Sequence, residues 1–268
     1  MSPEDWIEGS YGKRCFIKWD EYLRQWAYVK TFVKGPTGTG KTFLAAGVTH
    51  LWRTLYIDVE GGLFSAWPTV RKENIEVRLI REPESVDFFG RLAEAVSEAE
   101  SGKYEAVVLD SLTEIAGRME DDYAMKSTTG KVEFGDWFDM LGRIKRLCRR
   151  LRDCQCHTVV TSLTKPTKQE GGDAIFEPAL SGQAAAIVPS MFDTVGLCRK
   201  VTAKGQSSYV FTTDGPSVYQ VRDRYRALAP DETIPEKDGG KVWKKLEDGI
   251  RAMSGAGKEE KALVAAKK

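Results

Sequence analysis

The sequence of 268 residues has only two histidines, few cysteines and no excess of charge of either sign. Its 40 basic side chains balance 39 acidic ones, so the overall charge indicates neither nucleic-acid nor membrane binding, and any such contact must come from local patches. Five cysteines, an odd number, do not predict a disulfide framework and are typical of a reducing compartment.

Long apolar segments are also absent. No run approaches the roughly 18 to 20 apolar residues that cross a membrane, and the N-terminal MSPEDWIEGS is too acidic and polar for a signal peptide. We therefore expect a soluble, cytoplasmic protein without a membrane partner.

The scarcity of histidine also argues against a zinc site. Cys154-Gln-Cys156-His157 contains ligand types, but zinc sites usually need a second ligand pair, and His50 is the only other histidine. We expect Cys156 and His157 to begin a buried strand instead of holding a metal ion.

Residues 34–43 read KGPTGTGKTF and have the spacing of a phosphate-binding loop, in which four residues separate Gly35 from Gly40-Lys41-Thr42. Glycines let backbone N–H groups turn inward around a β-phosphate. Lys41 is expected to reach the β- and γ-oxygens, and the Thr42 hydroxyl to ligate Mg²⁺. The predicted nucleotide-binding residues are Gly35, Pro36, Thr37, Gly38, Thr39, Gly40, Lys41, Thr42 and Phe43.

The segments around this loop favour the same interpretation. Residues 28–33 are β-branched and aromatic, as in a strand, and residues 42–51 have a helical pattern. A strand, a glycine loop and a helix thus follow in the required order, and the helix start adds its positive dipole end to the anion site.

Apolar runs and helical periodicities alternate through the middle of the chain. The pattern predicts strands at 54–57, 75–80, 106–109 and 157–161, with helices at 85–100 and 136–152. This alternation is typical of an α/β fold with a mostly parallel sheet flanked by helices.

The rhythm changes after Pro189. Apolar runs at 191–201, 207–213 and 217–221 are separated by Lys204-Gly205 and Asp214-Gly215-Pro216, which indicates hairpins. We therefore expect antiparallel strands at the C-terminal edge of the sheet. The predicted organisation is an aromatic-rich cap or oligomer contact at 1–27, an α/β core at 28–226, and a C-terminal extension at 227–268 with a flexible tail.

Two apolar strands end in carboxylates. Asp110 follows 105–109 and is expected to hold Mg²⁺. No glutamate follows it directly, so the candidate for activating water is Glu60, at the end of the earlier strand, with Asp58 as support. The alternative is that these acids are only polar residues at strand ends.

The order of these motifs resembles the RecA-type ATPase core. Four segments, LYIDVEGG at 55–62, VLDSLTE at 108–114, LSGQA at 180–184 and FDTV at 192–195, resemble the short RecA-like single-strand annealing proteins of phages (Sak-type), within the phage AAA-type P-loop ATPase family. The likeness covers about residues 28–226.

This resemblance implies a RecA-like P-loop NTPase core that binds ATP and Mg²⁺ and hydrolyses ATP, with stimulation by DNA or by assembly. Glu60 matches the catalytic glutamate, Asp110 the second acid of the metal site, and Thr161 or Ser162 the polar sensor. The sensor is here a hydroxyl where RecA has an amide. The chain lacks RecA's oligomerisation arm and separate C-terminal domain, so full strand exchange is not expected.

Two segments occupy positions where RecA-like proteins carry DNA-binding loops. One is residues 163–172, which are glycine-rich and basic, and the other is residues 118–135, with Lys126 and Lys131. Lysines in such loops follow a phosphate backbone while aromatic rings stack on bases, which makes Lys165, Lys168 and Phe176 the candidate DNA contacts. The alternative is a nucleotide-gated surface loop with solvated charges.

Several basic residues are candidates for contacts between subunits at the nucleotide site. The resemblance implies that cations near the C-terminal edge reach a neighbouring subunit's γ-phosphate in a ring or filament, and the candidates are Arg199, Lys200, Arg222 and Arg224. For the last two, a structural ion-pair role around Asp223 is the alternative. The basic face of 143–152 is either solvated, a phosphate-contacting ridge or a subunit contact.

The sequence as a whole predicts an ATP-hydrolysing DNA-recombination protein that binds single-stranded DNA and promotes annealing. The expected partners are single-stranded DNA, further copies of the chain and a single-strand DNA-binding protein, in the host cytoplasm if a phage encodes it. The alternatives are a helicase-like, loader or packaging motor, and a nucleotide-dependent switch that acts through a protein interface.

Overall fold

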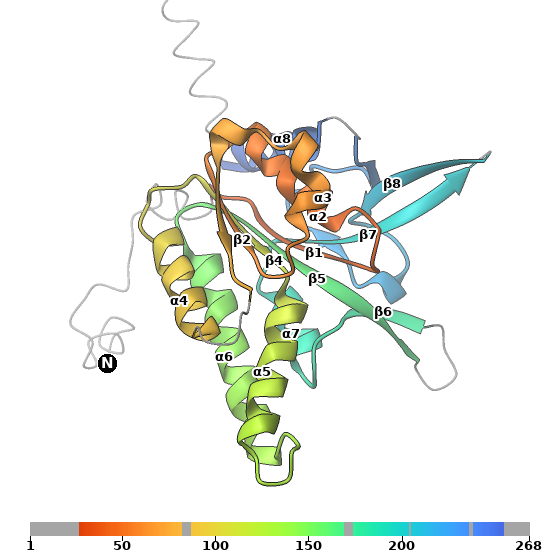
Figure 1. The fold of residues 1–268 in the computed structure, drawn as a ribbon. Coiled ribbons are helices and arrows are strands. Elements are labelled where there is room, and N and C mark those ends of the chain that lie inside the picture. Colours follow the sequence, from red (N-terminus) through yellow and green to blue (C-terminus); the bar gives the residue numbers. More distant parts are fainter. Residues whose placement is uncertain (1–26, 82–86, 169–173, 204, 236–237, 255–268) are drawn as a thin grey trace, which may run out of the picture.

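The computed structural model describes residues 27–81, 87–168, 174–203, 205–235 and 238–254 (Figure 1). Apart from residue 27, the predicted N-terminal cap lies outside the described residues, as does the tail from residue 255 onward. The predicted roles of these two segments therefore stay predictions.

A twisted ten-stranded sheet forms the centre of the described fold. Its main path runs β10-β8-β7-β1-β5-β4-β2-β3, with β6 paired to β5 and β9 paired to β7. The strands are β1 (Lys30–Gly35), β2 (Thr54–Asp58), β3 (Ile75–Leu79), β4 (Ala106–Asp110), β5 (His157–Lys168), β6 (Ala174–Pro178), β7 (Thr194–Ala203), β8 (Gln206–Thr212), β9 (Arg222–Asp223) and β10 (Asp231–Thr233).

The pairing confirms the predicted fold class. Strands β7, β1, β5, β4, β2 and β3 pair in parallel, whereas β6, β8, β9 and β10 pair antiparallel to their neighbours. The carboxyl ends of β1, β2, β4 and β5 therefore meet at one edge of the sheet, where ligands of parallel α/β folds bind.

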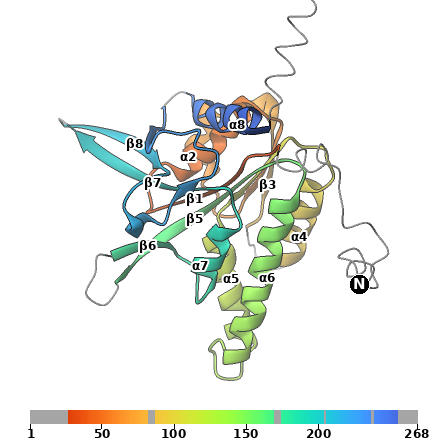
Figure 2. The ribbon, with the colours of Figure 1, turned by 180° about the vertical axis from the view of Figure 1, so that it is seen from behind.

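Helices cover both faces of the sheet (Figures 1 and 2). One face packs against α4 (Phe88–Ala99), α5 (Leu112–Lys126), α6 (Phe134–Asp153) and α7 (Ala184–Ser190). The other face packs against α2 (Lys41–Ala46), α3 (Leu63–Ala66) and α8 (Gly240–Ser254). Short 3₁₀ segments, Gly47–His50, Trp67–Thr69, Lys72–Asn74 and Ser217–Tyr219, connect these elements.

The two-residue period of a strand explains this two-sided core. Along β2, Leu55 and Ile57 lie in the cluster under α4 and α6, while Tyr56 between them lies in the opposite cluster with α2 and α8. All three are fully buried, which is why the central strands read as continuous apolar runs.

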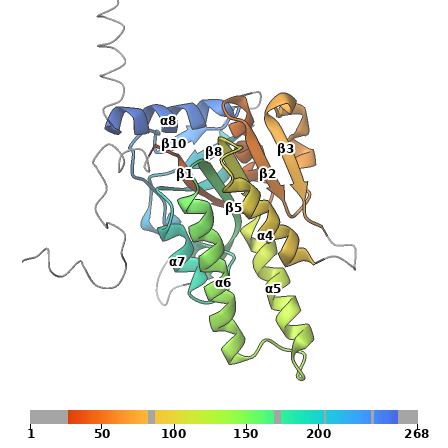
Figure 3. The same ribbon diagram turned by 90° about the vertical axis from the view of Figure 1, so that its left-hand side faces the viewer.

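Helices α5 and α6 form a long antiparallel pair that extends beyond the sheet (Figure 3). The prediction that residues 118–135 form a loop is therefore wrong, because residues 118–126 belong to α5 and only residues 127–133 connect it to α6. Contact of this segment with DNA stays a prediction. Apolar residues at helical spacing, Leu112, Ile115, Ala116 and Met119, bury this helix against the core.

Two further segments differ from prediction. Residues 217–221 do not form a strand; Ser217–Tyr219 form one 3₁₀ turn, which ends at Gln220 in the left-handed region with φ 46°. Strand β5 runs on to Lys168 and pairs antiparallel with β6, so residues 163–168 form one arm of a hairpin instead of an irregular loop.

The predicted C-terminal extension contributes to the core. Strand β10 pairs with β8, and α8 packs across α2, with the fully buried Trp243 donating its indole N–H to the Leu44 carbonyl over 2.8 Å. At the start of α8 the chain passes so close to the 3₁₀ turn after α2 that a Cβ on Gly47 would lie 2.6 Å from the Gly239 carbonyl carbon. This helix therefore supports the element that follows the glycine loop.

Candidate nucleotide site

The glycine loop lies between the carboxyl end of β1 and the start of α2. Gly38 and Gly40 have positive φ values of 73° and 88°, a conformation that side chains other than glycine's rarely adopt. Gly35 is required for a different reason: a Cβ there would lie 2.4 Å from the Cys198 carbonyl oxygen on β7. Helix α2 starts without a side-chain cap, so its first N–H groups remain available to an anion.

Lys41 is held at the mouth of this loop. Its ammonium donates to the Pro36 carbonyl over 2.8 Å, and Thr39 donates its hydroxyl to the same carbonyl over 2.7 Å. Burial lowers the pKa of Lys41, against the opposing effect of Cys198, Asp110 and Glu60. A cation that is partly desolvated and close to two carboxylates lies where phosphate oxygens would stabilise it.

Asp110 joins the glycine loop to three strands of the sheet. Its Oδ2 accepts hydrogen bonds from the Thr42 hydroxyl and the Tyr56 phenol, each over 2.8 Å, and its Oδ1 accepts one from the Thr161 hydroxyl. Tyr56 is fully buried, and burial together with Asp110 raises its pKa well above the ordinary value. Tyr56 thus stays a neutral donor that fixes the carboxylate.

Sequence reasoning missed Tyr56, because an aromatic residue inside an apolar strand is indistinguishable from core. A signal was present in the period-2 pattern, which places Tyr56 on the same face of β2 as Asp58.

Glu60 and Asp58 have distinct roles in the geometry after β2. Asp58 accepts hydrogen bonds from the backbone N–H groups of Gly61, Gly62 and Leu63 at 2.6, 3.2 and 3.2 Å, so it shapes the turn. Glu60 accepts a hydrogen bond from the Ser111 hydroxyl. Desolvation raises the pKa of Glu60, and nearby Asp110 adds to this, whereas Ser111 and Lys41 act in the opposite direction.

The space beside Thr42 and Asp110 suits a magnesium ion. The two side chains offer a hydroxyl and a carboxylate, the hard oxygen ligands that Mg²⁺ prefers. Gly62 leaves this space open, since a Cβ there would lie 3.3 Å from Thr42 Oγ1 and 3.8 Å from Asp110 Oδ2. The residues present therefore fit a nucleotide with its Mg²⁺.

The two predicted sensor hydroxyls lie at different places. Thr161 bonds directly to Asp110, whereas Ser162 lies 3.0 Å from the Thr113 hydroxyl at the start of α5. Thr113 also accepts the backbone N–H of Leu163 over 2.9 Å. Thr161 is thus part of the hydrogen-bond network around Asp110, and Ser162 connects the middle of β5 to the start of α5.

The candidate DNA contacts lie on the β5–β6 hairpin. Lys165 is exposed and donates to the Leu180 carbonyl over 2.9 Å, and Lys168 is the last residue of β5. Phe176 lies on β6 with its ring edge-to-face against Tyr219, at 5.8 Å between centroids. The hairpin starts where Thr161 and Ser162 end the buried part of β5.

Three of the four candidate trans-acting cations make intramolecular contacts. Arg199 pairs with Asp231 and also donates to Thr212. Arg222 donates to the Pro189, Ser190 and Phe192 carbonyls at the end of α7, a structural role, and Arg224 pairs with Asp193 over 2.8 Å. Lys200 is exposed on the β7–β8 hairpin.

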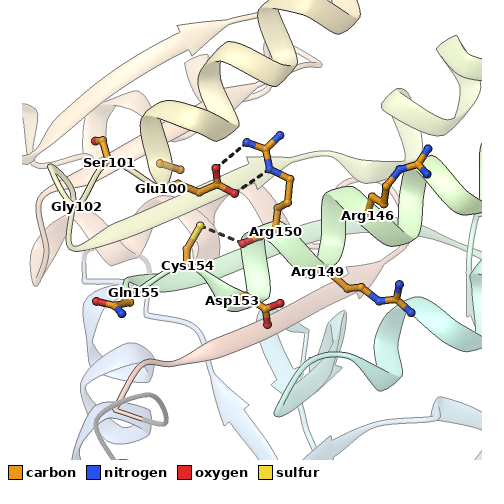
Figure 4. A pocket seen from close by; sticks show the side chains of 10 residues that line it. Glu100, Ser101, Gly102, Arg146, Arg149, Arg150, Asp153, Cys154 and Gln155 are labelled. Carbon is orange, nitrogen blue, oxygen red and sulfur yellow. Dashed lines mark hydrogen bonds and ion pairs between the residues drawn. The ribbon is translucent and has the colours of Figure 1, made fainter. Parts of the chain in front are cut away.

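The arginine-rich half of α6 borders a cavity of about 790 Å³ at the opposite edge of the sheet, where residues 100–105 and 154–156 lead into β4 and β5 (Figure 4). Arg150 makes a bidentate pair with Glu100 at 2.7 and 2.8 Å, while Arg146 and Arg149 extend from the helix. None of the residues lining this cavity belongs to the phosphate loop.

Comparison with known families agrees with this geometry. The model of a family described as an AAA domain matches residues 27–225, which is most of the chain. The chain belongs to this AAA family. As a member of an AAA-type P-loop ATPase family, it carries a nucleotide-binding ATPase domain. The match ends before α8, so the helix that packs on α2 lies outside the family region of this AAA protein.

No curated protein matches the sequence. Within the described residues, no helix is long and apolar enough to span a bilayer.

Proposed function

We propose that this AAA protein hydrolyses ATP and uses the cycle to control its grip on single-stranded DNA during annealing. The observation that carries the ATPase part is the hydrogen bond between Thr42 and Asp110, with Glu60 held by Ser111 beside it. These residues come from three separate segments and converge on one edge of the sheet.

The roles of the residues follow from their contacts. A bound Mg²⁺ would neutralise phosphate charge, with Thr42 and Asp110 as its protein ligands. Lys41 leaves the Pro36 carbonyl to hold phosphate oxygens as a point charge. Glu60 orients and deprotonates water, and its raised pKa gives its carboxylate a higher proton affinity than an exposed glutamate has. Ser111 holds Glu60 in position.

The DNA part of the proposal is supported by the β5–β6 hairpin. It carries the exposed Lys165 and the partly buried Phe176, and it continues directly from the strand that holds Thr161 against Asp110. A change in the phosphate site therefore has a short covalent route to the proposed DNA contacts. We also propose that the protein assembles into a ring or filament, in which the exposed Lys200 reaches a neighbour's site.

The decisive experiment is steady-state ATP hydrolysis with and without a single-stranded oligonucleotide, repeated for Lys41→Ala and Glu60→Gln. We expect the oligonucleotide to stimulate ATP hydrolysis in the native protein. We expect both substitutions to abolish this stimulated hydrolysis. Hydrolysis that ignores DNA would contradict the DNA part and leave the ATPase part intact. No hydrolysis under any condition would contradict both.

A protein-directed switch or motor is the second candidate function. Three apolar side chains at the tip of the α5–α6 pair are exposed by 64% to 81%, namely Met125, Phe134 and Phe138. Exposed aromatic residues are typical of protein-interaction surfaces. Hydrolysis unaffected by DNA and lost with Lys41→Ala would favour this function.

A further inference from the structure

Lys34 is a fully buried lysine at the last position before Gly35 of the phosphate loop. In the sheet it lies between Ser162 of β5 and Leu197 of β7, neither of which carries a charge. Its ammonium donates to the Phe176 carbonyl of β6 over 2.8 Å. This side chain therefore connects the strand that enters the phosphate loop to β6, the second arm of the candidate DNA hairpin, while backbone pairing of Gly35 with Leu163 connects that strand to the base of the first arm.

Burial of this cation is costly unless the position requires it. Burial lowers the pKa of Lys34 to about 8, and Glu177 of β6 is the charged group that opposes the change. An apolar side chain of similar length would fill the same space without desolvating a charge, and such replacements are often neutral or stabilising. Packing alone therefore does not explain the lysine.

Beyond the pairing of Gly35 with Leu163 at the base of its first arm, the hairpin has few other contacts with the phosphate-loop strand. Within the described part of the chain, β6 pairs with β5 alone, outside the main path of the sheet. Its other side-chain hydrogen bond lies within the same hairpin, where the Thr167 hydroxyl donates to Glu177 over 3.0 Å. Lys165 ties the hairpin to Leu180, on the chain that follows β6, and not to β1. Among the described residues, Lys34 makes the side-chain hydrogen bond that joins β1 to β6.

We propose that Lys34 is a positioning residue that couples occupancy of the phosphate loop to the placement of the β5–β6 hairpin. A shift of Gly35 on nucleotide binding moves Lys34, and Lys34 carries Phe176 with it through the carbonyl. This inference rests on the proposed nucleotide binding but not on DNA binding. By linkage, a ligand on the hairpin alters nucleotide affinity by the same factor.

Hydrogen exchange tests this coupling directly. The amide exchange rates of the non-proline residues in 164–168 and 174–178 are measured with and without a non-hydrolysable ATP analogue and Mg²⁺, while a fluorescent nucleotide reports binding in parallel samples. In the native chain we expect nucleotide to slow exchange in both arms by at least about fivefold, the lower end of typical coupling. Lys34→Met should bind nucleotide yet lose this response.

Thr167→Val is the matched control, because it removes a side-chain hydrogen bond, from Thr167 to Glu177 over 3.0 Å, from the same hairpin without touching β1. It should keep the nucleotide response. If Lys34→Met does not fold, as judged by circular dichroism, Lys34→Gln replaces it, since its shorter amide does not reach Phe176.

The outcomes separate this inference from the proposed function. Nucleotide binding with no change at the native hairpin, or an unchanged response in the Lys34 variant, overturns the coupling and leaves the ATPase proposal standing. A native chain that binds no nucleotide overturns the proposed function, and the coupling with it.

Discussion

Thr42 Oγ1 donates a hydrogen bond to Asp110 Oδ2 over 2.8 Å, across a separation of 68 positions in the sequence. The contact places the start of α2 beside the end of β4. The next residue, Ser111, donates a hydrogen bond to Glu60. The start of α2, the Asp110 carboxylate and the candidate base Glu60 therefore form one connected group. Replacing any member should affect hydrolysis in a way that identifies its role.

Glu60→Gln should separate binding from chemistry. The amide keeps the size of the side chain but removes the base, so we expect kcat to fall by roughly 10² to 10⁴ while nucleotide affinity is retained. Phosphate release and binding of a fluorescent nucleotide measure the two effects. Glu73→Gln, at an exposed glutamate, is the control and should leave both values unchanged. An equal loss of affinity and rate would instead make Glu60 a binding residue.

Tyr56→Phe should weaken the dependence on Mg²⁺ without removing the site. Loss of a hydrogen bond that orients a ligating carboxylate typically costs 10-fold or more in metal affinity, so the Mg²⁺ concentration for half-maximal hydrolysis should rise by about that factor.

The control for Tyr56 is Tyr104→Phe. That phenol is also buried and donates to carboxylates, Glu76 at 2.8 Å and Glu98 at 2.6 Å, but it precedes β4 at the opposite edge. Both variants should lose about 1 kcal/mol of stability. An equal Mg²⁺ requirement in the two would show that Tyr56 serves only the core.

The nucleotide site was largely predictable from sequence because its signals are local. The glycines near Gly38, the lysine, the strand before the loop and the helix after it all lie within twenty residues, so the sequence pattern of a single segment predicts them together. The acids at strand ends were found by the same logic. Tyr56 and Ser111 were missed as site residues because their roles depend on which strands become neighbours.

The misassigned segments show where local reasoning fails. The sequence of α5 has apolar residues at helical spacing, Leu112, Ile115 and Met119, and Ser111 at its N-cap, which together predict a helix. The resemblance to RecA-like proteins, which carry a DNA-binding loop at this position, led to the loop prediction instead. The contact of Trp243 with Leu44 spans 199 positions and has no local signature. The antiparallel pairing of β5 with β6 was missed because the family resemblance assigned residues 163–172 to a loop.

Trp243→Ala should destabilise the whole core. The indole is fully buried between α8 and α2, and truncation of such a side chain typically costs about 3 to 5 kcal/mol. Met253→Ala on the same helix is the control, because this residue is 66% exposed and should change stability by less than about 0.5 kcal/mol. Urea unfolding followed by circular dichroism measures both. A small loss in Trp243→Ala would mean that α8 docks weakly on α2.

Lys34 should make stability depend on pH in an unusual direction. Its pKa is about 8 in the folded chain against an ordinary 10.5, so between these values the unfolded chain binds more protons. The free energy of unfolding must then rise with pH through this window. Between pH 7 and 10 the native chain should gain roughly 2 to 3 kcal/mol relative to Lys34→Met, at 1.36 kcal/mol per pKa unit. Urea unfolding of both proteins across this range measures the difference, in which other groups such as the buried Lys30 cancel. Parallel curves would show that Lys34 keeps its ordinary pKa and stays charged in the folded chain, which would contradict the lowered pKa of this buried side chain.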